Sequence, residues 1–442
     1  MSDQMQKTTP EKMGKKLKAS LAFSLCSLLM ACSFSGNEPV TFKVSASAIM
    51  ASGLPPDQQS EEFAKGAELL LTGQGFSQAF DMTNQALQLD PHNFRARFIH
   101  ALLAPIILQK GIMVRVEPLI GKNPLALSRY RADIKKKRES ASYSKSEDFF
   151  YEKGLPAIES EAEMQKFIDS VTKALDGLRL FARAAKNQQL TVHANAVLVS
   201  DIIQRYAQSC EIKETANREY ELTCPPSENR YLVTLNQADF ESIQDMAAFL
   251  EIYLTTVNAY DLDGSVQSSV GIDDLRDGEY VRQFVDRLLQ DPKFGRLREQ
   301  NTFASVKGWS LDLVSGLHWA MNHQGELCPK GQSDPHNRVG MWFNAGICLS
   351  AGYQPYINIV EAAVNAEPQD NILEKNGQTL KSKLTVMEFF YHPITDLHSL
   401  GPVTFDACGR LQSTGDPGLA GIFPYRDANL VLPMSYKECV LK

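Results

Sequence analysis

The sequence predicts a mainly α-helical protein built of helical hairpins, followed by a loop-rich, disulfide-stapled C-terminal region. Three observations lead to this prediction. Between residues 57 and 323, apolar residues recur at spacings of three and four, as they do on one face of an amphipathic helix. From residue 324 that period gives way to stretches rich in Gly, Pro and Asp. Six cysteines remain after the N-terminal segment, an even count that is typical of disulfides in exported proteins.

The first 32 residues have the order of a bacterial export signal. Four lysines between Lys12 and Lys18 precede an apolar run at residues 21–31, which is too short for a membrane-spanning helix of about 20 residues. The run ends in Leu-Met-Ala-Cys, which resembles the lipobox of bacterial lipoproteins. The resemblance implies that residues 1–31 are a cleaved signal peptide and that the Cys32 thiol is acylated. An uncleaved anchor or an ordinary secretory signal is the alternative.

The residues after Cys32 indicate where the protein is held. Ser33 stands where many inner-membrane lipoproteins of Gram-negative bacteria have Asp, so by analogy the expected location is the outer membrane, facing the periplasm. Residues 32–56 are rich in Ser, Ala, Gly and Pro and show no helical period. This composition predicts a flexible linker between the bilayer and the folded domain.

The charge of the chain argues against nucleic acid as a partner. Removal of residues 1–31 takes away five lysines and two acidic residues, which leaves 40 basic and 50 acidic side chains. A chain with this excess of negative charge repels phosphate backbones. The partners that we expect are the lipid bilayer, through acylated Cys32, and a periplasmic or membrane protein.

The clearest repeat-like pattern lies in residues 63–93. It predicts two helices, over about 57–71 and 76–89, with glycines in the turn and a proline after the second helix. This helix–turn–helix resembles the tetratricopeptide repeat, in which small residues lie where two helices touch. The residues that match the family pattern are Phe63, Ala67, Phe76, Ala79, Ala86 and Pro91. The resemblance implies hairpins of α-solenoid type over residues 57–120, although Gly66 departs from the pattern; an ordinary helical hairpin is the alternative.

Residues 121–323 predict a helical domain. Within it, the polar and partly basic stretch 123–155 predicts a solvated helix end and loop. Amphipathic periods predict helices over residues 159–185, 190–208, 240–260, 278–290, 293–300 and 303–323. The Asp-rich loop at 261–274 does not fit the EF-hand calcium site, because Val266 stands where that motif needs Gly. No metal site is therefore predicted.

The C-terminal region, residues 324–442, predicts loops with helices at 356–366 and 379–391. Six cysteines are expected to form disulfides: Cys210, Cys224, Cys328, Cys348, Cys408 and Cys439. Pairing of sequence neighbours is the simplest connectivity, and it places two of the three bridges in this region; other connectivities stay open. No C-x-x-C pair occurs, which disfavours a zinc site or a redox dithiol.

The sequence contains no catalytic motif that we recognise. It lacks the G-x-S-x-G elbow, the H-E-x-x-H zinc helix, the P-loop and the dinucleotide fingerprint, so neither an enzyme nor a cofactor is predicted. The expected function is that of a membrane-anchored periplasmic lipoprotein with a protein-binding or scaffolding helical module. Two alternatives stay open: an accessory ligand-binding lipoprotein of a transport system, and a periplasmic enzyme with a site near Cys328 and Cys348.

Overall fold

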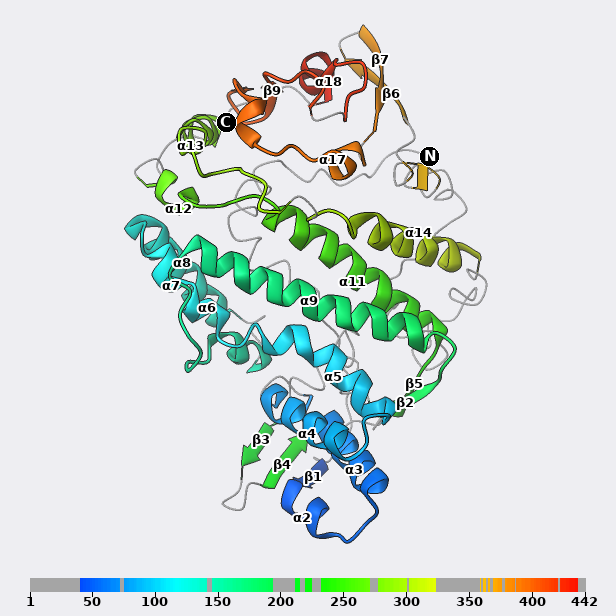
Figure 1. The fold of residues 1–442 in the computed structure, drawn as a ribbon. Coiled ribbons are helices and arrows are strands. Elements are labelled where there is room, and N and C mark those ends of the chain that lie inside the picture. Colours follow the sequence, from blue (N-terminus) through cyan, green and yellow to red (C-terminus); the bar gives the residue numbers. More distant parts are fainter. Residues whose placement is uncertain are drawn as a thin grey trace, which may run out of the picture.

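The fold is mainly helical, as the sequence predicts, with short antiparallel sheets at both ends (Figure 1). The structure is a computed structural model. The structure describes residues 40–71, 75–140, 145–193, 211–214, 219–224, 232–270, 277–299, 302–322, 369–375, 378–385, 387–419 and 422–435, with isolated positions between 358 and 365. The predicted signal peptide and Cys32 lie outside these residues.

The predicted helix–turn–helix is present as α3 (Pro56–Leu69) and α4 (Phe76–Leu89). The next helix, α5 (Phe94–Ile107), contacts both of them. Asn93 starts α5 by accepting a hydrogen bond from the Ala96 backbone, which satisfies one of the free N–H groups of the first turn. The predicted hairpin side chains Phe63, Ala67, Phe76, Ala79 and Ala86 are all buried, and Pro91 follows the end of α4.

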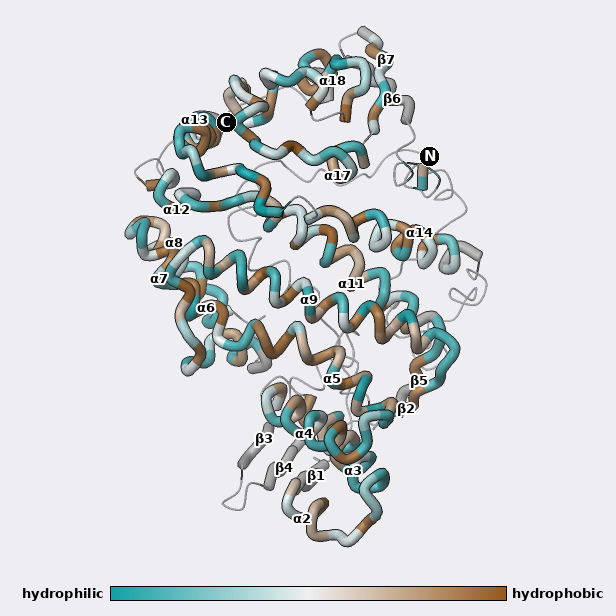
Figure 2. The backbone as a smooth tube through the Cα atoms, in the orientation of Figure 1, coloured by the Kyte–Doolittle hydropathy of each residue, from teal (hydrophilic) through white to brown (hydrophobic). Residues whose placement is uncertain are grey.

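The α5 helix belongs to the core of the protein. Within the described residues, one helical stretch, Phe94–Arg115, is long and apolar enough to cross a membrane by length and composition. Half of its apolar window is buried inside the protein, and Phe98, Ile99 and Leu103 have no exposed surface. Figure 2 shows the hydrophobic colouring along this helix. The apolar character of α5 is therefore explained by contacts with neighbouring helices.

Three long helices form the middle of the molecule. The helices predicted over 159–185, 240–260 and 303–323 are confirmed as α9 (Glu161–Ala185), α11 (Gln237–Asn258) and α14 (Val306–Asn322). α5 contacts α9, α9 contacts α11, and α11 contacts α14, so the helices follow one another in a stack (Figure 1). The rings of Phe98, Phe181 and Phe240 join α5, α9 and α11, with centroids 6.1–6.4 Å apart.

Shorter helices cover the sides of this stack. They are α6 (Ile112–Arg115), α7 (Glu117–Ile120), α8 (Pro124–Arg138), the 3-10 helix η1 (Lys145–Tyr151), α12 (Ser265–Ser268) and α13 (Asp277–Leu288). The helix predicted over 278–290 is confirmed as α13. The stretch predicted as a solvated helix end and loop is instead helical through α8. That helix has no buried residue, so the prediction of a solvated segment is confirmed. The helix is longer than predicted.

The predicted flexible linker over 32–56 is wrong for residues 40–51. These residues form β1 (Val40–Ser45) and α2 (Ala46–Ala51). β1 pairs antiparallel with β4 (Glu219–Cys224), which also pairs with β3 (Glu211–Glu214). The β-branched and aromatic residues Val40, Thr41, Phe42 and Val44 favour a strand here, but the strand that pairs with it lies far along the chain.

The helix predicted over 190–208 is wrong at its start. Residues Leu190–His193 form β2, which pairs antiparallel with β5 (Leu232–Leu235). Residues 194–208 lie outside the described part of the chain. The helix predicted over 293–300 is also wrong, because residues 293–299 run as turns and bridges; the Leu297 amide donates to the Thr395 carbonyl.

The C-terminal region contains more strand than predicted. It forms β6 (Gln369–Lys375), β7 (Gln378–Leu384), α17 (Glu388–Tyr391), η5 (Leu397–Leu400), β8 (Thr404–Phe405), β9 (Leu411–Ser413) and α18 (Ala428–Ser435). The helix predicted over 379–391 is wrong for its first half, which is β7. Leu380 and Leu384 pack against the cluster around Phe423 and Val431, and a spacing of four residues suits one face of either a helix or a strand.

Candidate functional site

The interface of α9, α11 and α14 holds the main concentration of buried charge in the described residues. At its centre lies Arg179, whose side chain is 8% exposed. Its guanidinium donates to three carboxylates: Nε to Glu251 Oε2 at 2.7 Å, Nη1 to Asp312 Oδ2 at 2.6 Å and Nη2 to Asp176 Oδ1 at 2.5 Å. One arginine of α9 thereby connects its own helix to α11 and to α14. We call these residues, with Arg183, Lys186, Glu241 and Asp245, the charged interface.

The Arg179–Glu251 pair lies in an environment with little water. Burial raises the pKa of Glu251 to about 8. The guanidinium of Arg179 lowers this pKa, but its effect is smaller than that of burial. Burial lowers the pKa of Arg179, but Glu251 and the other acidic neighbours outweigh it and hold that pKa above its usual value. Glu251 has no exposed surface, and its second oxygen, Oε1, has no hydrogen-bond partner in the described residues. Loss of Glu251 would remove one partner of the buried Arg179 guanidinium, and loss of Arg179 would raise the pKa of Glu251 further.

Asp245 occupies space that Gly316 leaves open. A Cβ atom built on Gly316 would lie 1.8 Å from Asp245 Oδ2, so the carboxyl group fills the place of a side chain on α14. Burial, followed by the negative charge of Glu241, raises the pKa of Asp245 from 3.8 to about 8. Lys186 lowers it, but the Lys186 Nζ lies 2.6 Å from Glu241 Oε2 and is shared with that carboxylate. Asp245 therefore carries a proton at neutral pH.

The balance of charge determines what the charged interface can do. Five carboxyl groups, on Asp176, Glu241, Asp245, Glu251 and Asp312, face three cations, on Arg179, Arg183 and Lys186. Protons can balance this excess of acid where the pKa values are raised. No group of three or more His, Cys, Asp or Glu in the described residues has a geometry that could hold a metal ion. The arrangement can therefore bind and release protons while it joins three helices.

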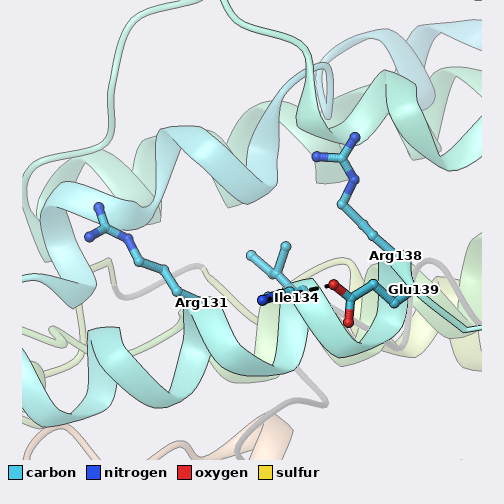
Figure 3. Close-up of a pocket in the computed structure, with 5 residues that line it drawn as sticks. Arg131, Ile134, Arg138 and Glu139 are labelled. Carbon is cyan, nitrogen blue, oxygen red and sulfur yellow. Dashed lines mark ion pairs between the residues drawn. The ribbon is translucent and has the colours of Figure 1, made fainter.

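A second candidate is a surface pocket on α8, with a volume of about 330 Å³ (Figure 3). Figure 3 shows Arg131 and Arg138 on the same side of the helix, with Ile134 between them. The pocket is lined by Arg131, Ile134, Lys135, Arg138 and Glu139. Both arginines also have acidic neighbours, since Arg131 lies 2.6 Å from Glu117 and Arg138 lies 3.4 Å from Asp148. This exposed basic helix stands out on a chain with net negative charge.

The predicted site residues lie in different places. The hairpin residues come together in the contact between α3, α4 and α5. Cys32, Cys210, Cys328, Cys348 and Cys439 are outside the described residues, and of Cys224 only the backbone, in β4, is described. Cys408 is disulfide-bonded, although its partner is not among the described side chains. The three pairings between sequence neighbours stay predictions.

Sequence reasoning missed the charged interface. Glu241, Asp245 and Glu251 lie in the helix with the clearest apolar period, and acidic residues in such a helix normally face water. Their burial depends on α9 and α14, which a single sequence does not align with α11. The indication of this site in the sequence is weak. Glu241 and Asp245 are four residues apart and lie close to the apolar face of the helix.

Comparison of the chain with models of protein families, with curated proteins and with solved structures finds no match in any of the three.

Proposed function

We propose that this chain is a lipid-anchored periplasmic lipoprotein whose stack of helices binds or scaffolds another protein of the cell envelope. The observation that carries the proposal is the order of the first 32 residues: clustered lysines, a short apolar run, and Leu-Met-Ala-Cys. Acyl chains on Cys32 would hold the protein on a bilayer, because two or more chains give stable anchoring. The outer membrane is the proposed location, because Ser33 stands where many inner-membrane lipoproteins have Asp.

The arrangement of the helices supports a binding role. α3, α4, α5, α9, α11 and α14 contact one another in chain order, as helices do in arrays of α-solenoid type. Ala79 and Ala86 are fully buried between α4 and its neighbours, which fits the small-residue contacts of a tetratricopeptide hairpin. Such arrays present an extended surface to a partner.

The basic surface of α8 indicates the chemistry of the partner. Arg131 and Lys135 have side chains that are 60% and 77% exposed, on a chain whose overall charge is negative. A partner with an acidic segment would complement this helix locally. The proposed partner is therefore a periplasmic or membrane protein that presents acidic side chains.

Replacing Cys32 by Ala tests the anchoring. The Cys32→Ala chain should remain an unlipidated precursor of higher mass and leave the membrane fraction where the mature protein is found. Cys26→Ala is the matched control, because it removes a thiol from the same segment but keeps the Leu-Met-Ala-Cys sequence. Normal processing and fractionation of the Cys32→Ala chain would refute the proposal.

The binding role needs a second measurement on the intact lipoprotein. Cross-linking in membranes should capture a defined partner, and Arg131→Glu with Lys135→Glu should reduce that capture. Arg282→Glu, on the exposed face of α13, is the control for a change of charge elsewhere. Equal capture by both variants would show that α8 is not the binding surface.

A further inference from the structure

The proposed anchor lies close to one end of the fold. Seven residues, 33–39, separate Cys32 from the start of β1 at Val40. A chain extends by at most about 3.6 Å per residue, so Val40 lies within roughly 29 Å of Cys32. In Figure 1, β1 and α2 lie at the end of the molecule that carries α3 and α4, and α17 and α18 lie at the opposite end. The end with β1 is therefore the one that a lipid on Cys32 would hold near a bilayer.

This end presents an exposed segment without charge. No Asp, Glu, Lys or Arg occurs from Val44 to Pro56, which spans α2 and the loop to α3. Two large apolar side chains of this segment are exposed, Met50 at 56% and Leu54 at 37%. We call residues 46–56 the tip segment.

The tip segment has a defined conformation. Ser45 caps α2 by accepting a hydrogen bond from the Ala48 backbone, and the Ser52 hydroxyl donates to the Ile49 carbonyl. The side chain of Gln59, on α3, donates to the Leu54 carbonyl at 2.7 Å. Met50 and Leu54 are thus held on the surface by a structured turn, which limits the conformational entropy that is lost when they contact another phase.

We propose that the tip segment is a membrane-contacting surface, which enters the headgroup region of the bilayer that holds Cys32. The inference rests on the acylation of Cys32 proposed above. Three features support lipid as the occupant: the short tether, the absence of any charge that would have to leave water, and the exposed apolar side chains beside it. The tip contact and the acyl chains together would fix the orientation of the helical stack relative to the membrane.

Tryptophan quenching by lipids with brominated acyl chains tests the proposal, because bromine quenches only at short range. The probe is Met50→Trp in the acylated mature protein, reconstituted in phosphatidylcholine vesicles. Leu430→Trp is the matched control, since Leu430 is 61% exposed on α18 at the opposite end. Trp309, Trp319 and Trp342 give a background that the wild-type protein measures. We expect quenching of the Met50→Trp signal to be several-fold stronger than that of Leu430→Trp, and lost when Leu54→Glu is added.

Each other outcome overturns the inference in a distinguishable way. If the intact mass shows acylated Cys32 but Met50→Trp is quenched no more than Leu430→Trp, the tip does not contact lipid and the anchoring proposal survives. If the Met50→Trp emission shifts to shorter wavelength without bromine quenching, protein covers the tip, as a second copy or a partner would. An unmodified Cys32 removes the tether and overturns both proposals.

Discussion

Asp245→Asn should change how the stability of the protein depends on pH. In the folded chain the pKa of Asp245 is raised to about 8 by burial and by Glu241, whereas the ordinary value of 3.8 applies when the chain is unfolded. The folded state therefore holds this proton more tightly. Stability from this group is highest below pH 3.8, and it is lost as the pH rises from 3.8 towards 8. Asn cannot ionise, so the variant lacks this loss.

The size of the effect follows from the two pKa values. Each pH unit between them costs the wild type about 1.4 kcal/mol of free energy of unfolding. Over the interval from 3.8 to about 8 the cost sums to about 6 kcal/mol as an order of magnitude. The difference in stability between Asp245→Asn and wild type should grow with that slope from pH 5 to pH 8 and level off above it. Glu251, whose pKa is also raised to about 8, keeps a similar slope in both proteins.

Urea unfolding followed by tryptophan fluorescence measures this difference, because Trp309 lies on α14 in the helical stack. The free energies of unfolding of the two proteins are compared at several values between pH 5 and pH 9. Asp57→Asn, on the exposed first turn of α3, controls for the loss of one carboxylate. A difference between Asp245→Asn and wild type that stays constant across this range would refute the reasoning, since it would mean that Asp245 has the same proton affinity folded and unfolded.

Three further substitutions test the packing. Gly316→Ala should destabilise the protein by about 1–3 kcal/mol, because its Cβ would lie 1.8 Å from Asp245 Oδ2. Adding Asp245→Ala to the same chain should restore the thermal midpoint. If the two substitutions instead lower the stability additively, this contact is contradicted. Arg179→Met should cost about 3–5 kcal/mol in urea unfolding at pH 9, above the pKa of Glu251, because the Glu251 carboxylate then loses its buried partner. An unchanged free energy of unfolding would show that the pair is not buried. Ala79→Leu should cost about 1–3 kcal/mol, because the larger side chain does not fit where α4 packs against its neighbours. An unchanged thermal midpoint would contradict the close packing around Ala79.

The sequence predicts local structure well where the apolar period is long. α9, α11 and α14 each bury a stripe that repeats at three and four residues, and that stripe is visible without knowledge of its partner. The hairpin of α3 and α4 is predicted for the same reason, and because glycines and a proline mark its ends. These features depend on residues close to one another in the chain.

The strands and the charged interface depend on distant residues. β1 and β2 are short, and each is stabilised by pairing with a strand that comes much later, so their local sequence alone does not determine them. Arg179 and Glu251 are 72 positions apart, and only the packing of α9 on α11 turns two ordinary charged residues into a buried pair. Nothing in the local pattern distinguishes these residues from the solvated charges of α8.

β1 cannot form its sheet before β4 is available, because β4 is the strand that pairs with it. Val40 lies opposite Cys224 and Ser45 opposite Glu219, so β1 has no partner in this sheet until the chain has been synthesised as far as residue 224. Until then its backbone is an open edge that other extended chains can join. Truncated products that end before Glu219 should therefore be prone to aggregate through residues 40–45, which are the described residues nearest to Cys32 in the sequence.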